Sequence, residues 1–286
     1  MIGDLTIIVV LYQEKFELIR ACLKNIKNFK IIIVDNDNNV KIKKKIISEF
    51  FIYKYVLNKK NIGFSKAANI AVKLSDTKYI MNINADCLIK QDDVLKLLLA
   101  NKADPNCFIT SPTFYDSKDK LSQNASSFSD KIISYNNNYF DGDVCVDWVL
   151  GAAIVFKKKI FIEIGMFDEN FFLYFLDEDI CRKAFKKKKS TIQMSAVKAI
   201  HVHGIPKTKN FFKKIFLKSY HFTYDELYYH FKINNHNKIF SKLKKKMPNY
   251  LIKFLINVLI LNLGKATHYL SLILAFLKFK KFLIKN

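Results

Sequence analysis

Two short apolar runs that end at acidic residues constrain the fold of this chain most strongly. Ile31–Val34 continues directly into Asp35, and Tyr79–Ile83 is followed by the tripeptide Asn84–Asp86. Such runs are typical of strands buried on both faces of a parallel sheet, which present ligand-binding groups at their carboxyl ends. An acid at one end can accept a hydrogen bond from a base, and an acid at another can hold a metal ion over phosphates. The pattern therefore predicts a nucleotide-dependent enzyme.

The first 105 residues alternate apolar runs with helical patterns. A continuous apolar run at residues 5–11 predicts the first strand, and apolar residues between Phe16 and Ile26 then recur at helical spacing. The elements expected next are a strand at 31–34, a helix at 40–50, a strand at 51–57, a helix around 67–74 and a strand at 79–83. This alternation predicts an α/β fold with a mostly parallel, doubly wound sheet flanked by helices.

The pattern weakens from Pro105 to Asp147, where polar stretches indicate loops around short strands. Loops of this kind suit the face that receives a second substrate. Regular structure is expected again as a strand at Val149–Phe156, a helix at 159–164 and a strand at Thr191–Ser195.

The composition restricts the class of protein further. Half of the 286 residues are hydrophobic, which excludes a disordered chain. The formal net charge is +23, from 48 Lys and Arg against 25 Asp and Glu. This charge favours anionic lipid or nucleic acid as a partner, although solvated lysine-rich faces would also account for it. Five cysteines without a CxxC pair indicate reduced, structural thiols in a cytoplasmic protein.

The composition changes beyond about Pro206. Two apolar stretches, Phe254–Gly264 and Ala266–Leu277, are separated by Lys265. Each is shorter than the roughly 20 residues that a membrane-spanning helix needs. We expect a helical hairpin that lies in a membrane interface with its lysines toward the headgroups. The alternative is a pair of C-terminal helices packed on the domain.

Candidate ligand-binding residues follow the two acid-ended strands. The Asp35 carboxylate can accept the imide N–H of uracil or thymine, although many strand-end aspartates instead cap a helix. Asp86 can supply one oxygen ligand to Mg²⁺ or Mn²⁺, whereas Asn84 offers only a neutral carbonyl. For both of these residues the alternative is a capped turn before the next helix.

The segment Phe167–Arg182 packs acidic residues among aromatic ones. Apolar surroundings raise the pKa of a carboxylate toward the range of a general base. Asp177 and Asp179 bracket the expected start of a helix, where the helix dipole favours negative charge. We expect Asp179 to be structural and Asp177 to be catalytic.

Two histidines, His201 and His203, follow the last expected strand. We expect at most one of them to meet a metal ion. A solitary histidine usually has a structural role. Here it follows an acidic turn and an acidic helix start, which makes it a candidate metal ligand.

Taken in order, these motifs resemble those of the inverting glycosyltransferases of family 2, and in particular the bacterial rhamnosyltransferase-like members that build surface polysaccharides. The resemblance covers about residues 4–205. It is carried by Leu5–Tyr12, Ile31–Asn36, Asn61–Asn69, Tyr79–Asp86, Trp148–Phe156, Phe167–Arg182 and His201–Gly204.

The resemblance implies a GT-A (Rossmann-like) glycosyltransferase domain at residues 1–205. Its nucleotide-binding half would be 1–105 and its acceptor-binding, catalytic half 106–205. Residues 206–286 lie outside the resemblance, and their own pattern predicts basic amphipathic helices that associate with an anionic membrane. We expect the protein to be cytoplasmic and peripherally bound to the cytoplasmic face of the inner membrane.

The resemblance also implies a role for each matching residue. Asp177 would be the base, and Asp86 with His201 would hold Mg²⁺ or Mn²⁺. A dTDP- or UDP-linked sugar would be the donor, and a glycan or lipid-linked molecule the acceptor. The implied donor-binding residues are Tyr12, Asp35, Asn61, Gly63 and Asn84, and the secondary candidates are Asp179, Trp148 and His203.

Three residues depart from the family's pattern. Gln13 stands where Asn commonly follows the first strand's Tyr, Asn84 removes one acid from the metal motif, and Leu176 replaces the Glu before the base. The two missing acids leave open a catalytically degenerate protein that acts as a membrane-associated scaffold. A basic nucleic-acid-binding protein is disfavoured, because Arg is nearly absent and no RNA-binding signature is present.

Overall fold

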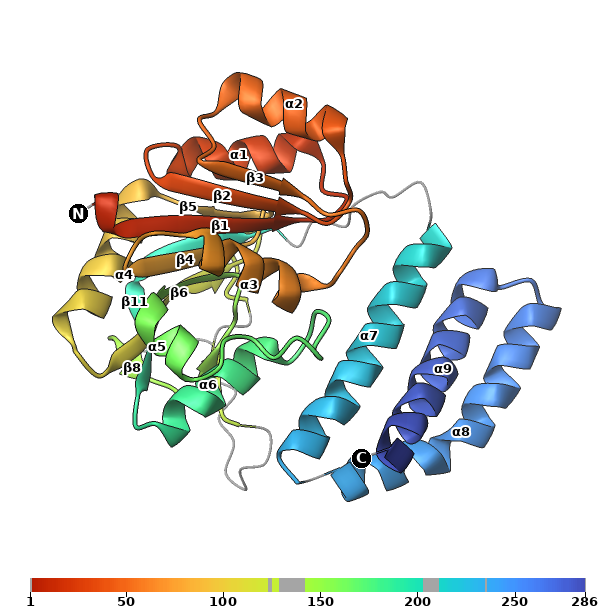
Figure 1. The fold of residues 1–286 in the computed structure, drawn as a ribbon. Helices are drawn as coiled ribbons and strands as arrows, with labels where there is room; N and C mark the ends of the chain where they lie inside the picture. The colour runs from red at the N-terminus through yellow and green to blue at the C-terminus, as the bar shows by residue number, and fades with distance from the viewer. Residues whose placement is uncertain (1, 123–124, 129–141, 203–210, 235, 286) are drawn as a thin grey trace. The chain divides into compact units, whose positions relative to one another are not determined.

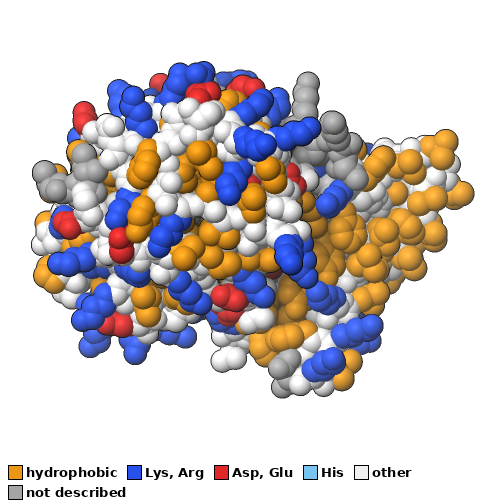
Figure 2. Space-filling model, turned by 45° about the horizontal axis from the view of Figure 1, so that its top comes forward, with side chains coloured by type: hydrophobic (Ala, Val, Ile, Leu, Met, Phe, Trp, Pro, Cys, Tyr) orange, Lys and Arg blue, Asp and Glu red, His pale blue; other side chains and the backbone are white. Residues whose placement is uncertain are grey.

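The structure is a computed structural model that describes residues 2–122, 125–128, 142–202, 211–234 and 236–285 (Figure 1). The chain divides into two compact units. One comprises Met1–Asp168 and Leu176–Pro206, and the other comprises Glu169–Phe175 and Lys207–Asn286. Figure 2 shows many Lys and Arg side chains on the surface and few acidic ones, in keeping with the net charge of +23.

The first unit is built on one large mixed sheet. Its strands run in the order β3-β2-β1-β4-β10-β6-β11-β5, and β8 pairs with β11. The strands are β1 (Leu5–Leu11), β2 (Lys30–Asp35), β3 (Lys54–Leu57), β4 (Tyr79–Ile83), β5 (Cys87–Ile89), β6 (Cys107–Tyr115), β8 (Val144–Cys145), β10 (Ala153–Lys157) and β11 (Ser190–His201). A small second sheet pairs β7 (Ala125–Ser126) with β9 (Trp148–Val149).

Most neighbouring strands on the N-terminal side of this sheet run parallel. β3, β2, β1 and β4 pair in parallel, and β10 is inserted antiparallel between β4 and β6. The helices of this unit are α1 (Phe16–Ile26), α2 (Val40–Glu49), α3 (Phe64–Leu74), α4 (Gln91–Ala103), α5 (Lys158–Glu163) and α6 (Leu176–Lys186). The predicted mostly parallel α/β sheet flanked by helices is confirmed.

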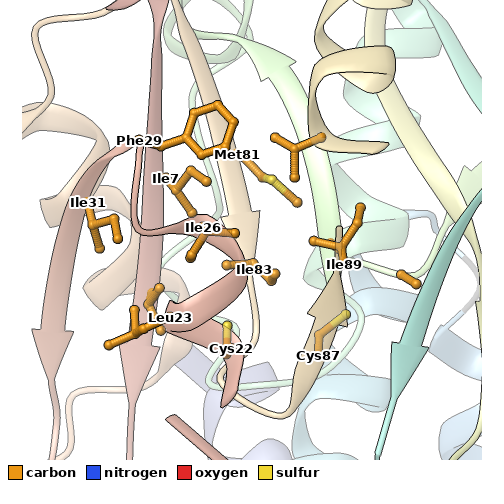
Figure 3. Close-up of a cluster of buried hydrophobic side chains, with 14 of the residues drawn as sticks. Ile7, Cys22, Leu23, Ile26, Phe29, Ile31, Met81, Ile83, Cys87 and Ile89 are labelled. Atoms are coloured by element: carbon orange, nitrogen blue, oxygen red, sulfur yellow. The ribbon is translucent and has the colours of Figure 1, made fainter. Parts of the chain in front are cut away.

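The core follows from the alternation of side chains along the strands. Alternate residues of β1, from Ile7 to Leu11, pack with the apolar faces of α1 and α4 in one buried cluster. In α1 the buried residues Ile19, Leu23 and Ile26 recur at helical spacing. Leu23 and Ile26 lie in one cluster with side chains of β1 and β4 (Figure 3). Helix α3 contacts β1 and β2 with small buried residues and covers the other face. Complete burial of one such aliphatic side chain contributes about 1.5–3 kcal/mol to stability.

The structure corrects the expectation of loops after Pro105. Residues Cys107–Tyr115 form the long strand β6, of which all but the last residue are buried. The polar residues of β6 made the segment resemble a loop in the sequence. Their hydroxyl groups, however, form hydrogen bonds inside the protein. Thr110 donates to the Leu97 carbonyl (2.9 Å), and Thr113 donates to the Met194 carbonyl (3.1 Å).

Two other strand boundaries differ from expectation. The strand predicted at Val149–Phe156 is divided into β9 and β10 by a turn that contains Gly151. The strand predicted at Thr191–Ser195 is longer and extends to His201 as β11. Bulges in its pairing with β6 explain why its sequence lacks clean alternation.

The second unit contains three long helices, α7 (Phe211–Lys232), α8 (His236–Leu259) and α9 (Leu263–Lys285). Helix α9 packs on both α7 and α8. The break predicted at Lys265 lies earlier, at residues 260–262, where Leu261 adopts a left-handed conformation with φ 56°. Within the described residues, no helix combines the length and the apolar character required to cross a membrane.

Candidate active site

The carboxyl end of β2 presents Asp35 at a small half-open pocket. Asp35 is only 1% exposed and is the last residue of the strand. Its carboxylate accepts hydrogen bonds from the Tyr55 hydroxyl (3.1 Å) and from the N–H groups of Asp37 (2.7 Å) and Asn39 (3.3 Å). Glu14 and Asp37 line the same pocket. The structure therefore places Asp35 where strand-end carboxylates of α/β sheets meet ligands.

Glu14 is an acid of this pocket that the sequence reasoning missed. Its carboxylate accepts a hydrogen bond from the N–H of Tyr12, directly after β1. Burial, with smaller contributions from the charges of Asp86 and Asp35, raises the pKa of Glu14 to about 7. An acid two residues beyond the strand-end Tyr was the available signal. The ends of β1 and β2 thus bring two acids, Glu14 and Asp35, to one pocket.

The expected donor-binding residues Asn61 and Gly63 are tied to the end of β2. Gly63 precedes α3 with φ 88°, a conformation that favours glycine. Its N–H donates to the Asn61 side-chain oxygen (3.0 Å), and its carbonyl accepts from the Asn36 amide (3.1 Å). Because Asn36 follows Asp35 in the chain, these hydrogen bonds hold the 61–63 segment beside the pocket.

Asp86 and His201 come together although 115 positions separate them in the sequence. Strand β11 pairs with β5 so that His201 lies opposite Cys87, and the Val202 N–H donates to the Asp86 carbonyl (2.9 Å). This pairing brings His201 Nε2 to 3.2 Å from Asp86 Oδ1. The side chain of His201 is buried. His203, the other candidate, lies outside the described residues.

The chemistry of this pair fits a divalent metal ion. A carboxylate oxygen and an imidazole nitrogen are both ligand atoms for divalent metals, and here they lie 3.2 Å apart. No group of three or more His, Cys, Asp and Glu side chains is arranged to hold a metal among the described residues. A metal here would therefore depend on substrate phosphates and water for its remaining ligands, as Mg²⁺ and Mn²⁺ commonly do.

Asp177 lies in the first turn of α6 and is held by the turn between β9 and β10. Its Oδ2 accepts a hydrogen bond from the Gly151 N–H (3.2 Å), and the Asn82 side chain of β4 donates to the Gly151 carbonyl (2.7 Å). A Cβ atom at Gly151 would lie 3.3 Å from the Asp177 Cβ, so the close approach favours glycine. Burial raises the pKa of Asp177 above its ordinary value of 3.8, against the opposing effect of the Gly151 hydrogen bond.

The same turn also reaches the residues beside the metal candidate. The Ala152 carbonyl accepts the N–H of Asn84 (2.8 Å), and the Asn84 carbonyl accepts the N–H of Cys87 (2.9 Å). Residues 151 and 152 therefore connect Asp177 through main-chain hydrogen bonds to the turn that carries Asp86. The lining of the pocket at Asp35 includes neither Asp86 nor Asp177.

The structure places the remaining candidate residues in contacts that do not involve Asp35, Asp86 or Asp177. Asp179 is buried and lies 3.3 Å from the Lys183 ammonium, one helical turn along α6. The Trp148 indole N–H donates to the Ser127 carbonyl (3.0 Å). Gln13 has a left-handed backbone (φ 63°), and its amide donates to Asp37 (3.2 Å). Leu176, which replaces an acid, is buried at the start of α6.

Comparison with known proteins identifies similar glycosyltransferases. Rhamnosyltransferase WbbL of Escherichia coli (strain K12) is 24% identical over 233 residues, which cover 73% of this chain and 87% of the relative. The dTDP-rhamnosyl transferase RfbF of Shigella flexneri is 23% identical over 216 residues, which cover 71% of each chain. These relatives confirm the predicted rhamnosyltransferase-like character.

The fold is also found in solved structures. The crystal structure of GalNAc-T7 with UDP, GalNAc and Mn²⁺ matches with a TM-score of 0.59 and 12% identity over 79% of this chain. This chain spans about half of that protein, since the match covers 51% of it. At this identity the match shows the fold alone, which is the expected GT-A fold.

The family itself is established by the sequence model for "Glycosyl transferase family 2", which matches residues 6–165. These residues are more than half of the 286-residue chain and include β1, β2, β4 and the turn at Gly151. The protein therefore belongs to glycosyl transferase family 2 and is a glycosyltransferase.

Proposed function

We propose that the protein is an inverting glycosyltransferase that transfers a sugar from a nucleoside-diphosphate donor to a glycan or lipid-linked acceptor in surface polysaccharide synthesis. The observation that carries the proposal is the hydrogen-bonded turn at residues 151–152. It holds the buried carboxylate of Asp177 and joins it to the turn bearing Asp86, which is paired with His201. A candidate base and a candidate diphosphate site are thus linked by main-chain contacts.

The donor would bind along the carboxyl ends of β1, β2 and β4. Asp35 would accept the N–H of the base, with Tyr12 beside it. Asn61 and Gly63 would line the donor site, which the hydrogen bond from Asn36 to Gly63 holds next to Asp35. Asn84 would contact the donor from the end of β4.

Transfer would proceed by direct displacement at the anomeric carbon. Asp177 would remove the proton of the acceptor hydroxyl while the hydroxyl oxygen forms a bond to the anomeric carbon. The bond from that carbon to the diphosphate oxygen would break, and the nucleoside diphosphate would leave with the bonding electron pair. The attack comes from the side opposite the leaving group, so the configuration inverts. The raised pKa of Asp177 suits a group that takes a proton.

Asp86 and His201 are the residues that would hold Mg²⁺ or Mn²⁺. The metal would supply positive charge that stabilises the departing diphosphate. The crystal structure of GalNAc-T7, which shares the fold, contains UDP and Mn²⁺, and this supports the proposal that a divalent metal is used.

The donor nucleotide is testable by thermal unfolding. A ligand at about 100 times its Kd stabilises the folded form by about 2.7 kcal/mol, and we expect a rise in Tm of roughly 5–10 °C. The measurement compares dTDP, dTDP-rhamnose, UDP and a UDP-sugar, each with and without Mn²⁺. We expect dTDP-rhamnose with Mn²⁺ to give the largest rise, since a relative is a dTDP-rhamnosyl transferase. ATP with Mn²⁺ is the control, and equal rises for all nucleotides would contradict the proposed specificity.

The hairpin of α8 and α9 supports a second part of the proposal, attachment to an anionic membrane. Exposed apolar side chains gather on the helical unit (Figure 2) and include Leu251, Ile252, Leu255, Ile256, Leu259, Ile260, Leu261 and Leu263. Residues 236–286 contain many lysines and no Asp or Glu. Apolar surface flanked by lysines suits an interface of anionic headgroups over acyl chains. A lipid-linked acceptor would be met there, on the cytoplasmic face of the inner membrane.

Replacing Leu259 and Leu261 together by Gln is expected to weaken vesicle binding by about 10²-fold, because each loses the free energy of burying a large aliphatic side chain. These residues are 81% and 79% exposed, so the fold should tolerate the change. The measurement is co-sedimentation with vesicles of anionic and of neutral lipid. Phe51→Gln is the matched control, at 77% exposure in the other unit. Undiminished binding by the double variant would refute the assigned surface.

A further inference from the structure

A fully buried carboxylate in α7 holds the segment that leads to the candidate base. Asp225 Oδ2 accepts hydrogen bonds from three consecutive main-chain N–H groups, those of Phe172 (3.1 Å), Leu173 (2.9 Å) and Tyr174 (3.0 Å). Its Oδ1 lies within hydrogen-bonding distance of the Phe172 N–H as well (3.2 Å). Asp225 itself is 0% exposed. Such a row of N–H groups is a typical binding site for an anion.

Aromatic contacts reinforce this attachment within the helical unit. The Phe172 ring stacks on His221 with centroids 3.6 Å apart, and the Phe175 ring stacks on Tyr229 at 5.5 Å. The Asn170 amide donates to the Tyr228 hydroxyl (3.1 Å). Residues 169–175 accordingly group with the C-terminal helices rather than with the sheet that precedes and follows them in the chain.

The segment is also fixed at its other end. Asn69 of α3 donates to the Phe167 carbonyl (2.9 Å) and accepts the Phe167 N–H (3.2 Å). After Phe175, which has a left-handed backbone (φ 62°), the chain enters α6 and reaches Asp177 two residues later. The stretch before the candidate base is therefore held by one amide pair and by one buried carboxylate.

We infer that Asp225 is a positioning residue for sugar transfer, which acts by fixing residues 172–174 and, through the chain, the approach to Asp177. The inference rests on the proposed function and assigns a role in it to the C-terminal helical unit. Asp225 touches no reacting atom. Its carboxylate determines the conformation of the loop, and misplacement of a catalytic group by about 1 Å lowers turnover by about 10²-fold.

The test compares Asp225→Asn with Glu226→Gln, a control that removes the neighbouring carboxylate of α7. Asn keeps one acceptor oxygen in place of two and loses the charge. In Asp225→Asn we expect kcat to fall by about 10–100-fold and the donor KM to stay within about twofold. Amide hydrogen exchange at residues 172–174 should become at least about tenfold faster. Glu226→Gln should match the wild type in all three measurements.

A second variant keeps the inference testable if Asp225→Asn does not fold. His221→Ala removes the ring stacked on Phe172 and leaves the carboxylate in place. We expect His221→Ala to lower kcat by a smaller factor than Asp225→Asn does, again without a change in the donor KM.

The outcomes separate the inference from the function on which it rests. Faster exchange at 172–174 with wild-type kcat would overturn the positioning role alone, as would a loss of kcat that only follows the loss of folded protein. Unchanged exchange would show that the carboxylate does not hold the segment. A wild-type protein that binds no nucleotide and transfers no sugar would overturn the proposed function and this inference with it.

Discussion

Replacing Asp177 with Asn is expected to lower kcat by about 10²–10⁴-fold, because an amide cannot take the acceptor proton. The loss corresponds to about 3–5 kcal/mol of barrier. Asn is isosteric and can still accept the Gly151 N–H, so the fold should survive. The measurement is transfer from a nucleotide sugar to acceptor at saturating donor, with circular dichroism as the folding check.

The matched control for this variant is Asp179→Asn, two residues along the same helix. Asp179 is paired with Lys183, so its replacement should lower the stability and leave kcat within a few-fold. Equal losses of kcat in both variants would contradict the assignment of the base to Asp177 alone. Near-normal turnover by a folded Asp177→Asn protein would show that Asp177 is not the catalytic base.

The raised pKa of Asp177 adds a prediction about stability with a definite sign. Between the ordinary value of 3.8 and the raised value, the folded protein binds more protons at this group than the unfolded chain does. The contribution of Asp177 to stability therefore decreases as the pH rises through that window. Asp177→Asn should consequently match or exceed the wild-type Tm at pH 7, although it is nearly inactive.

The second large effect is expected at the metal candidate. Asp86→Asn should reduce kcat/KM by about 10²–10³-fold, the range found when one stabilising group for a developing negative charge is lost. His201→Ala should act in the same direction. Activity of the wild type should disappear with EDTA and return with Mn²⁺ or Mg²⁺.

A binding measurement makes this prediction independent of turnover. Calorimetric titration with UDP or dTDP should show tighter binding with Mn²⁺ in the wild type and no such gain in Asp86→Asn. Asp92→Asn, an exposed acid at the start of α4, is the control and should retain the gain. Metal-independent nucleotide binding and transfer by the wild type would exclude the metal role of Asp86 and His201.

The N-terminal side of the sheet could be predicted from the sequence because its strands are continuously apolar and its helices have one apolar face. Strand β6 escaped because Thr110 and Thr113 look polar in sequence, whereas their hydroxyls bond to carbonyls in the core. The division into β9 and β10 at Gly151 was not predicted because a turn within an apolar run hardly changes the local composition.

Candidate site residues could be named from the sequence where an acid at the end of a strand or the start of a helix suggests its own chemistry, as at Asp35, Asp86 and Asp177. Glu14 was missed because its raised pKa depends mainly on burial, with smaller contributions from neighbouring acids, and both arise only in the folded protein. Asp225 was missed for a related reason. Its partners are main-chain N–H groups about 50 positions earlier, and these groups have no signature in the sequence.

The antiparallel insertion of β10 also bears on how this site can change over time. The strand begins at the edge of the sheet where β4 ends, so the turn before it offers peptide groups, rather than side chains, to Asp177 and Asn84. Every residue except proline, which lacks the N–H, offers the same peptide groups. These bonds therefore do not depend on the side chain at position 152, although Ala152 itself is buried in the core, and a Cβ at position 151 would crowd Asp177. The backbone path of this turn, rather than its side chains, maintains the hydrogen bonds to Asp177 and Asn84.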